Sequence, residues 1–262
     1  MKSPTTEEKA EAFRALHSGE PFVIPNPWDA GSARVLAALG FRALATTSSG
    51  FAFTLGRPDG AATLGEVVDH VVTLAEATDL PVSVDLEDGH GFDPGVAIAR
   101  VAEAGAVGAS IEDWDREHLY ALDEAAERVG AAVVAACAVG SPFTLTARAE
   151  NYIRGNPDLD DTIARLQAFE AAGADALYAP GLSDLDDIRA VCSAVSKPVN
   201  VLARPNLTFQ ELVEAGAQRV SVGGSLTWAA VQALVEAASA IRDRGDFSLL
   251  GASPPADWFE PA

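Results

Sequence analysis

Two kinds of apolar segment alternate along the chain. Segments of the first kind begin with proline and continue as short runs of β-branched or apolar residues. They are residues 21–24, 81–84, 142–145 and 198–201. This pattern is typical of a buried strand, because proline is tolerated at the first position of a strand, where its missing N–H costs least.

Segments of the second kind are alanine-rich helices that end at glycine and are followed by a strand about two residues later. The four glycines are Gly40, Gly105, Gly173 and Gly216. Glycine is favoured just after a helix, because it adopts the left-handed conformation that ends the helix without strain.

The strict alternation of the two kinds predicts eight strands separated by helices. The strands are expected at residues 21–25, 43–47, 81–86, 107–112, 142–147, 175–179, 198–203 and 218–223. Eight such units predict a (β/α)8 TIM barrel. A doubly wound open sheet is the competing fold, but it needs a glycine-rich turn after the first strand, and residues 25–29 (Pro-Asn-Pro-Trp-Asp) do not provide one.

An apolar stripe and a capping pattern at Ser183 and Asp186 predict the helix between strands six and seven. The stripe consists of Leu185, Ile188, Cys192 and Val195. The two cysteines of the chain, Cys137 and Cys192, each lie inside a predicted helix. We expect both to be buried small apolar residues rather than disulfide partners or nucleophiles.

Length and composition fit one large domain. The chain has 262 residues, of which 48% are hydrophobic, and we expect residues 1–262 to form a single barrel domain. A C-terminal tail is predicted from about residue 245. Its aromatic residues, Trp258 and Phe259, suggest that the tail docks on a neighbouring surface.

The net charge of the chain narrows the classes of molecule that it can bind. With 38 acidic and 18 basic residues, the net charge of −20 disfavours nucleic acid and anionic membranes as partners. No apolar run approaches the roughly 20 residues that span a bilayer, and residues 1–10 are polar, unlike a signal peptide. We therefore expect a cytoplasmic protein whose partner is a small molecule.

Acidic residues follow the strands where barrel enzymes place their chemistry, at the C-terminal strand ends. They are Asp85 and Glu87 after the third strand, Glu112 after the fourth, and Asp59 in the loop after the second. Asp85 and Glu87 are two residues apart and are expected on one side, with Glu112 about 5 Å away on the next strand. Crowded carboxylates without cysteine favour Mg²⁺, or Mn²⁺, over Zn²⁺. A solvated acidic rim is the alternative, which the buried residues just before these acids disfavour.

Two further features at the predicted barrel mouth can bind an anion. Arg148, at the end of the fifth strand, can hold a substrate carboxylate with two parallel hydrogen bonds, or it can neutralise Glu150 or Glu112 instead. Residues 47–49 (Thr-Ser-Ser) offer hydroxyl and N–H groups for a carboxylate, although such turns are often only turns.

Together these motifs resemble the isocitrate lyase and phosphoenolpyruvate mutase superfamily, in its short single-barrel branch, from about Phe22 to Leu234. The segments that carry the resemblance are residues 26–33 (Asn-Pro-Trp-Asp-Ala-Gly-Ser-Ala), 47–59 (ending Gly-Arg-Pro-Asp), 85–91 (Asp-Leu-Glu-Asp-Gly-His-Gly), 108–113 (Gly-Ala-Ser-Ile-Glu-Asp), 147–148 (Ala-Arg), 200–205 (Asn-Val-Leu-Ala-Arg-Pro) and 219–224 (Arg-Val-Ser-Val-Gly-Gly). In combination they are highly specific, and none suffices alone.

The resemblance implies a metal site at the barrel mouth. Asp85 would be the direct ligand of Mg²⁺. Glu87 and Glu112 would hold metal-bound waters, and Asp59 would lie close to the site and belong to the catalytic set.

The resemblance also implies how a 2-oxo acid is bound. Thr47, Ser48 and Ser49 would bind its carboxylate and oxo group, Arg148 would supply a cationic contact, and Asn200 is a further candidate substrate ligand. The implied reaction makes or breaks a bond to C3 of a pyruvate unit through a metal-stabilised enolate.

The chain departs from the superfamily at two catalytic positions. The lyases carry a Lys-[Lys/Arg]-Cys-Gly-His loop after the fourth strand, whereas residues 113–119 read Asp-Trp-Asp-Arg-Glu-His-Leu, so the catalytic cysteine is missing. The only lysines are Lys2, Lys9 and Lys197, so the gating-loop lysine of the mutases is missing as well. The second absence weakens phosphonate chemistry.

Two smaller departures bear on the substrate and on proton transfer. His90 stands where tyrosine is usual in the superfamily, and Glu150 stands where aspartate is usual. His118 and His90 are candidate acid–base groups; the alternative is a surface residue at 118 and a structural turn residue at 90.

The leading hypothesis is a Mg²⁺-dependent lyase or decarboxylase for an oxaloacetate-like or 2-methylisocitrate-like acid, because these cleavages need the metal-bound acid more than a dedicated thiol. The runner-up is phosphonopyruvate hydrolase or phosphoenolpyruvate mutase. An answer of another class is a barrel that binds a 2-oxo acid without turning it over. The resemblance further implies a homo-oligomer, dimer or tetramer, that exchanges its last helix between subunits, with which the apolar helix at residues 226–241 is compatible.

Overall fold

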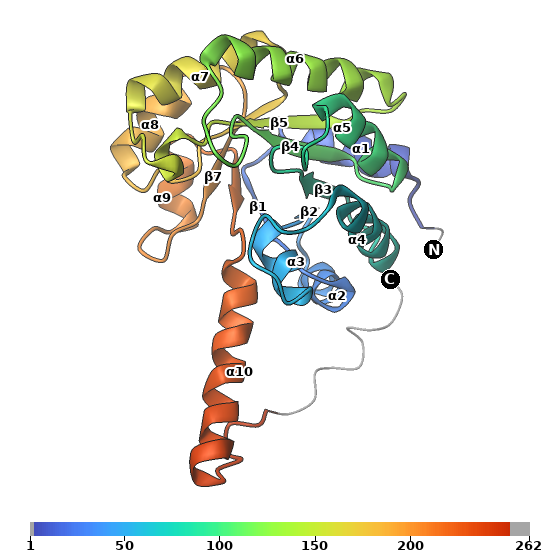
Figure 1. Cartoon of the computed structure of the whole chain (residues 1–262), viewed down its shortest axis with the longest axis vertical. Coiled ribbons are helices and arrows are strands. Elements are labelled where there is room, and N and C mark those ends of the chain that lie inside the picture. The colour runs from blue at the N-terminus through green and yellow to red at the C-terminus, as the bar shows by residue number, and fades with distance from the viewer. Residues whose placement is uncertain (1–2, 252–262) are drawn as a thin grey trace.

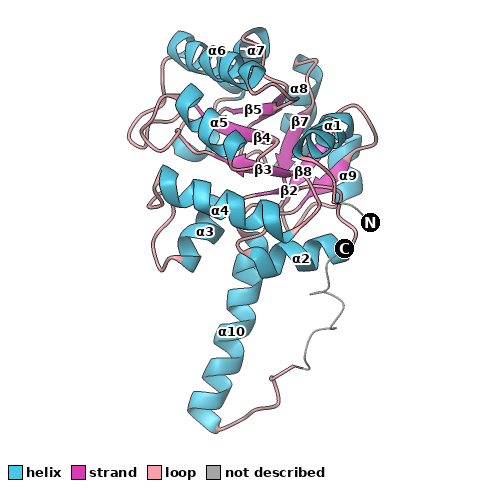
Figure 2. Ribbon diagram, turned by 90° about the vertical axis from the view of Figure 1, so that its right-hand side faces the viewer, coloured by secondary structure: helices cyan, strands magenta, loops and turns pink. Residues whose placement is uncertain are grey.

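A computed structural model, which describes residues 3–251, shows a (β/α)8 barrel (Figures 1 and 2). The eight strands are β1 (Phe22–Ile24), β2 (Leu44–Ala45), β3 (Val82–Asp85), β4 (Gly108–Glu112), β5 (Thr144–Arg148), β6 (Ala176–Tyr178), β7 (Val199–Leu202) and β8 (Arg219–Ser221). The predicted fold is thus confirmed. Trp258 and Phe259, for which docking was predicted, lie outside the described residues.

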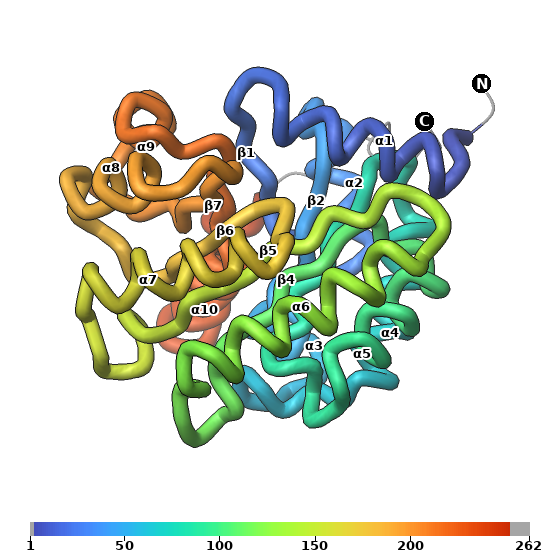
Figure 3. Tube along the Cα trace, turned by 90° about the horizontal axis from the view of Figure 1, so that it is seen from above, coloured from blue at the N-terminus to red at the C-terminus, as the bar shows by residue number. Residues whose placement is uncertain are grey.

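The helices surround the strands, and α4, α5, α6 and α7 lie side by side along one flank (Figure 3). Their bounds are α1 (Thr6–Leu16), α2 (Ala30–Ala38), α3 (Ser48–Thr54), α4 (Leu64–Ala77), α5 (Pro94–Glu103), α6 (Leu122–Ala138), α7 (Leu159–Ala171), α8 (Leu185–Ala194), α9 (Phe209–Glu214) and α10 (Ser225–Arg244), with a 3₁₀ turn η1 (Asn151–Arg154).

All strand pairs are parallel, in the order β1-β8-β7-β6-β5-β4-β3-β2, so the ladder is open between β1 and β2. A backbone hydrogen bond from Ala45 N to Pro25 O, 3.1 Å long, crosses this seam. The buried amide of Asn26 crosses it too, donating to Thr46 O at 2.9 Å and accepting from the N–H groups of Val222 and Gly223 at 3.0 and 2.9 Å. One side chain therefore joins the C-terminal ends of β1, β2 and β8.

The strands are shorter than the sequence pattern predicts. Pro21, Pro81 and Pro198 each lie one residue before a strand, and Pro142 lies two residues before β5. Proline has no N–H to give to a ladder, so pairing starts after it. The four predicted helix-ending glycines are confirmed, because all have φ between 86° and 106°.

Two details of the helix predictions are wrong. The N-cap of α8 is Asp184 rather than Ser183, and its carboxylate accepts from the N–H of Asp186 at 2.8 Å. A carboxylate one residue later in the chain satisfies the free N–H groups of the first turn.

The expected burial of both cysteines is the second. Cys137 is exposed, because α6 turns Ala132 and Ala136 toward the core, and Cys192 is half-buried.

Helix α1, which no sequence pattern predicted, closes the N-terminal end of the barrel. Its Phe13 is fully buried against residues at the starts of the strands, among them Phe22 and Val107. His17, just after α1, lies against Phe13 O at 2.9 Å and Arg219 Nη1 at 3.0 Å. Arg219 is a donor only, so Nε2 of His17 accepts from it and Nδ1–H donates to Phe13 O.

This position makes the fold sensitive to acid. Burial, and then the Arg219 charge, lower the pKa of His17 from 6.5 to about 3. Between pH 6.5 and about 3, His17 is protonated in the unfolded chain but neutral in the folded chain. Its contribution to the free energy of unfolding is therefore fully present above pH 6.5 and is lost as the pH falls. We expect His17 alone to remove about 1.4 kcal/mol of the free energy of unfolding per pH unit below 6.5.

Urea titrations between pH 7.5 and 5 measure this slope. His17→Gln should flatten it, whereas His118→Gln, at an exposed position, should leave it unchanged. Equal slopes for the native chain and the His17 variant would contradict the assignment.

The last helix, α10, extends away from the barrel (Figures 1 and 2). Among residues 3–251 no helix is long and apolar enough to cross a membrane. The cytoplasmic location expected from the sequence stays a prediction.

Candidate active site

A cavity of about 360 Å³ opens at the C-terminal ends of the strands. Every strand end contributes to it directly or through the loop that follows. Its polar and charged lining residues are Asn26, Thr46, Thr47, Ser48, Ser49, Asp59, Ser83, Asp85, Ser110, Arg148, Tyr178, Asn200, Arg204, Arg219 and Ser221. The cavity therefore brings together Thr47, Ser48, Ser49, Asp59, Asp85, Arg148 and Asn200 of the predicted site.

Helix α3 positions the hydroxyl groups on one wall. Thr47 is its N-cap, and its hydroxyl accepts from Gly50 N at 3.4 Å and lies 3.3 Å from Ser49 Oγ. A side chain on Gly50 would meet Thr227 Oγ1 and Thr47 Cγ2 at 2.6 Å. Only glycine therefore lets α3 pack this closely against the start of α10.

Arg148 is the centre of the charge network. Its guanidinium lies 2.7 Å from Asp85 Oδ1, 3.0 Å from Glu112 Oε1 and 2.8 Å from Glu150 Oε1, and it stacks on the Tyr178 ring at 5.1 Å. Of the two alternatives left open for Arg148, the structure shows the neutralisation of Glu112 and Glu150. Arg148 also lines the cavity, and its contact with a substrate carboxylate stays a prediction.

The carboxylates around Arg148 titrate differently. Burial acts to raise the pKa of Asp85, but the Arg148 charge and hydrogen bonds from Glu87 N–H and Ser48 outweigh burial and hold that pKa below its usual value. Burial raises the pKa of Glu112 well above the usual range, with Glu150 and Asp85 adding to the effect, while Arg148 acts to lower it. Asp85 is therefore the carboxylate of the pair that stays charged.

The predicted acids are divided between two neighbouring cavities. Asp85 lines the first, whereas Glu87 and Glu112 line a second of about 300 Å³, and Asp59 lines both. The expected placement of Asp85 and Glu87 on one side of a strand is wrong, because β3 ends at Asp85 and Glu87 has φ of 48°. Glu112 is likewise not opposite Asp85, which pairs with Ser110; the N–H of Glu112 donates to Glu87 O at 2.9 Å.

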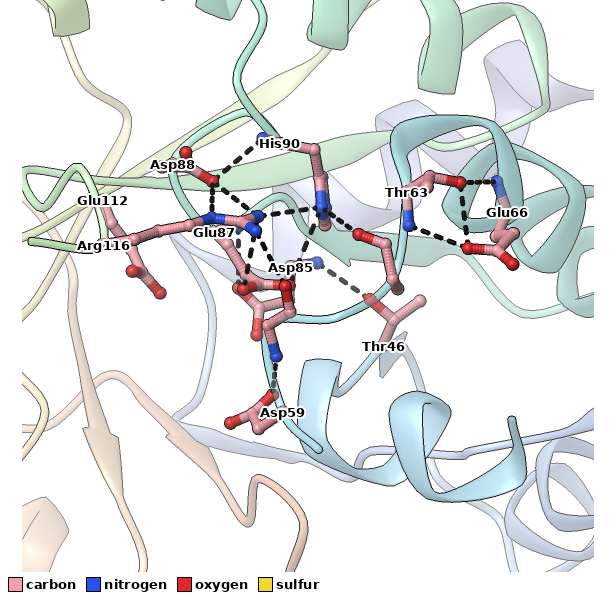
Figure 4. Close-up of polar contacts among 12 residues, drawn as sticks. Thr46, Asp59, Thr63, Glu66, Asp85, Glu87, Asp88, His90, Glu112 and Arg116 are labelled. Atoms are coloured by element: carbon pink, nitrogen blue, oxygen red, sulfur yellow. Dashed lines mark hydrogen bonds and ion pairs between the residues drawn. The ribbon is translucent and has the colours of Figure 1, made fainter. Parts of the chain in front are cut away.

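Arg116 compensates part of the acidic charge in the loop after β3. It donates to Asp88 Oδ1 at 3.0 and 3.1 Å and lies 3.9 Å from Glu87 Oε2 (Figure 4). Burial, followed by the charge of Asp85, raises the pKa of Glu87 to about 8, and Arg116 offsets only part of this rise. The site therefore holds more carboxylates than its own cations neutralise.

This charge imbalance bears on whether the residues suit a divalent cation. Within residues 3–251, no three His, Cys, Asp or Glu side chains converge as a ready-made metal site. Mg²⁺ usually keeps several waters and takes only one or two carboxylates from the protein. Asp85 at the cavity wall, with Glu87 and Glu112 nearby, matches that kind of site, and a cation there would offset the unneutralised charge.

The predicted histidines lie elsewhere. His118 is exposed and lines neither of the two cavities, so its catalytic role stays a prediction. His90 is half-buried in the loop after β3, where its Nδ1 lies 3.1 Å from Ala62 O. It does not line either cavity.

Eight polar or charged lining residues were given no role from the sequence, among them Asn26, Tyr178, Arg204 and Arg219. Burial raises the pKa of Tyr178 to about 12, so its hydroxyl stays protonated. Arg219 stood inside a segment that carried the family resemblance, but it begins β8. Asn26 and Arg204 stood inside such segments too, and each is a polar residue two positions beyond the end of a strand. That position was the available signal.

Comparisons with known proteins show which family the chain resembles. A family model described as phosphoenolpyruvate phosphomutase matches residues 13–242. An oxaloacetate decarboxylase of Bradyrhizobium sp. is 31% identical over 251 residues, covering 91% of this chain and 86% of the relative. A 2-methylisocitrate lyase of Halalkalibacterium halodurans is 30% identical over 249 residues, covering 90% and 78%. A crystal structure from Burkholderia cenocepacia, provisionally described as a lyase/mutase, superposes with a TM-score of 0.92 at 51% identity, covering 96% of this chain and 94% of that one.

Proposed function

Because the chain belongs to the phosphoenolpyruvate phosphomutase family, within the isocitrate lyase/phosphoenolpyruvate mutase superfamily of carbon–carbon lyases and mutases, we propose that it is a Mg²⁺-dependent lyase that cleaves a bond to C3 of a small 2-oxo acid. An oxaloacetate-like acid is the first candidate. The observation that carries the proposal is a single cavity that joins Asp85, Arg148 and the hydroxyl groups of residues 47–49 at the barrel mouth.

Asp85, assisted by Glu87 and Glu112 through water, would hold the metal. When bound, Mg²⁺ would act as a Lewis acid that draws electron density from the 2-oxo group. The hydroxyl groups of Thr47, Ser48 and Ser49 would donate to the substrate carboxylate and 2-oxo oxygens and fix the orientation of the pyruvate unit.

With oxaloacetate, the C3–C4 bond would break, the carboxylate would leave as CO₂, and the electron pair would pass to the enolate of pyruvate. A proton would then be taken up at C3. No histidine lines the cavity among the described residues, so the proton would come from water or from a lining hydroxyl. Arg148 would keep Asp85 ionised and in place throughout.

The decisive experiment incubates the purified chain and Mg²⁺ with oxaloacetate, 2-methylisocitrate, isocitrate or phosphonopyruvate. We expect pyruvate from oxaloacetate faster than in the Mg²⁺ blank, and EDTA should stop the excess. Phosphate release from phosphonopyruvate would favour the hydrolase instead, and a new P–C signal by phosphorus NMR would favour the mutase. Binding of pyruvate without product from any acid would favour a non-catalytic barrel.

We further propose that a second copy of the chain covers α10. Leu234 and Val235 are 63% and 53% exposed on this projecting helix, and Trp228 at its base is 48% exposed. Apolar side chains this exposed on an isolated helix mark an interaction site. The helix exchange implied by the family resemblance would bury them.

Light scattering after size exclusion tests the oligomer. We expect a multiple of 27.1 kDa for the native chain and a shift toward the monomer for the double variant Leu234→Glu, Val235→Glu. Gln232→Glu, exposed on the same helix, should leave the mass unchanged. A monomeric native chain would rule out the proposal.

A further inference from the structure

Three arginines line the main cavity: Arg148, Arg204 and Arg219. The charge of Arg148 is matched by the three carboxylates it contacts. Arg219 is buried and its nitrogens are all engaged, with Asn200 Oδ1 and Thr146 Oγ1 at 2.9 Å and His17 Nε2 at 3.0 Å. Every guanidinium nitrogen of these two arginines is therefore already in contact with a protein atom.

Arg204 differs from both. It lies in the loop after β7, two residues beyond Leu202, and is half-buried. Its Nε is fully buried and has no hydrogen-bond partner, and its guanidinium makes no hydrogen bond or ion pair with any residue from 3 to 251. A buried donor without a partner is costly. Because Arg204 also lines the cavity, a ligand acceptor there would give this guanidinium the partner that it lacks.

The position of Arg204 in the barrel says which part of a ligand would meet it. In the strand order, β7 lies across the barrel from β3. Asp85 ends β3, and the hydroxyl groups of residues 47–49 follow the neighbouring β2. A pyruvate unit bound to that wall would have Arg204 on the opposite side of the cavity, where a substituent on C3 could reach it.

We propose that Arg204 binds a second carboxylate, on the C3 side of the substrate, and that the enzyme is therefore selective for 2-oxo dicarboxylic acids. This inference rests on the proposed function. The planar guanidinium matches a carboxylate with two parallel hydrogen bonds, and its single charge balances the single charge of that group. A phosphonate, with up to two charges, would leave one of them unmatched at this position.

Calorimetric titration in Mg²⁺ with two probes tests the assignment. Pyruvate carries one carboxylate, and 3,3-difluorooxaloacetate carries a second on the C3 side. We expect Arg204→Gln to raise the Kd of the dicarboxylate by about 10- to 100-fold, the loss of a charge-assisted hydrogen bond, with less than about a two-fold change for pyruvate. Arg189→Gln, an exposed arginine on α8, should change neither.

The outcomes separate this inference from the proposed function. If the native chain binds neither probe, the proposed function fails. If it binds both and Arg204→Gln weakens them equally, or weakens neither, the assignment of Arg204 fails while the proposed function stands. A third titration uses phosphonopyruvate, and a larger loss of affinity for it than for the dicarboxylate in Arg204→Gln overturns the choice of a carboxylate. Equal thermal unfolding of the native chain and the variant shows that the fold is kept, and Arg204→Lys should restore part of the affinity.

Discussion

Replacing Asp85 by alanine should lower kcat/KM for the Mg²⁺-dependent cleavage by about a hundred-fold to a thousand-fold, the usual effect of removing a group that stabilises charge in the transition state. Asp85 ends β3, lines the cavity and has its pKa held low, so it is the carboxylate available in charged form to a cation. The charge of Arg148 keeps two other carboxylate partners in the variant, which limits the structural damage.

Steady-state kinetics over a range of Mg²⁺ concentrations measure this effect. Asp85→Asn keeps the size of the side chain and removes its charge, so it should lose activity to a similar degree. Asp186→Asn, with a side chain 90% exposed on α8, is the matched control and should retain full activity. Activity of Asp85→Ala within two-fold of the native chain would remove Asp85 from the site.

Replacing Arg148 by methionine should lower the free energy of unfolding by about 3–5 kcal/mol at pH 7, as expected when one partner of a buried ion pair is removed. The side chain is only 11% exposed and is the shared partner of Asp85, Glu112 and Glu150. Without it, these carboxylates repel one another inside the protein. Turnover should be lost as well, because Asp85 would no longer be held in its charged form.

The sign of the pH dependence provides a separate check. Arg148 lowers the pKa values of Asp85 and Glu112, so in the variant their folded pKa values should rise above the unfolded ones. The folded chain then binds more protons than the unfolded chain, and its stability falls as the pH rises. The deficit of Arg148→Met should therefore be smaller at pH 5 than at pH 8 in urea titrations. Adding Glu150→Gln should recover part of the loss, because it removes one of the carboxylate charges that Arg148 no longer offsets. A deficit that does not vary with pH would contradict this account.

The fold was predictable because its signals are local. Proline before a strand and glycine after a helix act within a few residues, and the two signals alternate along the chain, each at four of the eight strands. Strand ends were not predictable to the residue, because they depend on pairing with neighbours. Helix α1 was missed because its burial comes from only one face of a polar segment, through Ala10 and Phe13.

The sequence pointed to seven residues that line the candidate cavity, but it did not predict their arrangement or give a role to Asn26, Tyr178, Arg204 and Arg219. The alternation of side chains along a strand correctly placed Asp85 at the end of β3. It failed to predict the direction of the Glu87 side chain, because alternation holds only within a strand and β3 ends before Glu87. His118 lies in a loop, whose path depends on tertiary contacts that the sequence pattern does not report. Arg204 carried no sequence signal that distinguished it from a paired arginine, because the absence of partners is a property of three-dimensional packing alone.

The amide of Asn26 gives the seam between β1 and β2 a consequence for ligand binding. The same side chain that holds three strand ends together is also part of the cavity wall. Separation of β1 from β2 at this seam would therefore change the shape of the cavity. A ligand that fits the present shape would stabilise the closed seam. By thermodynamic reciprocity, a ligand that stabilises the closed seam must also bind more tightly when the seam is closed.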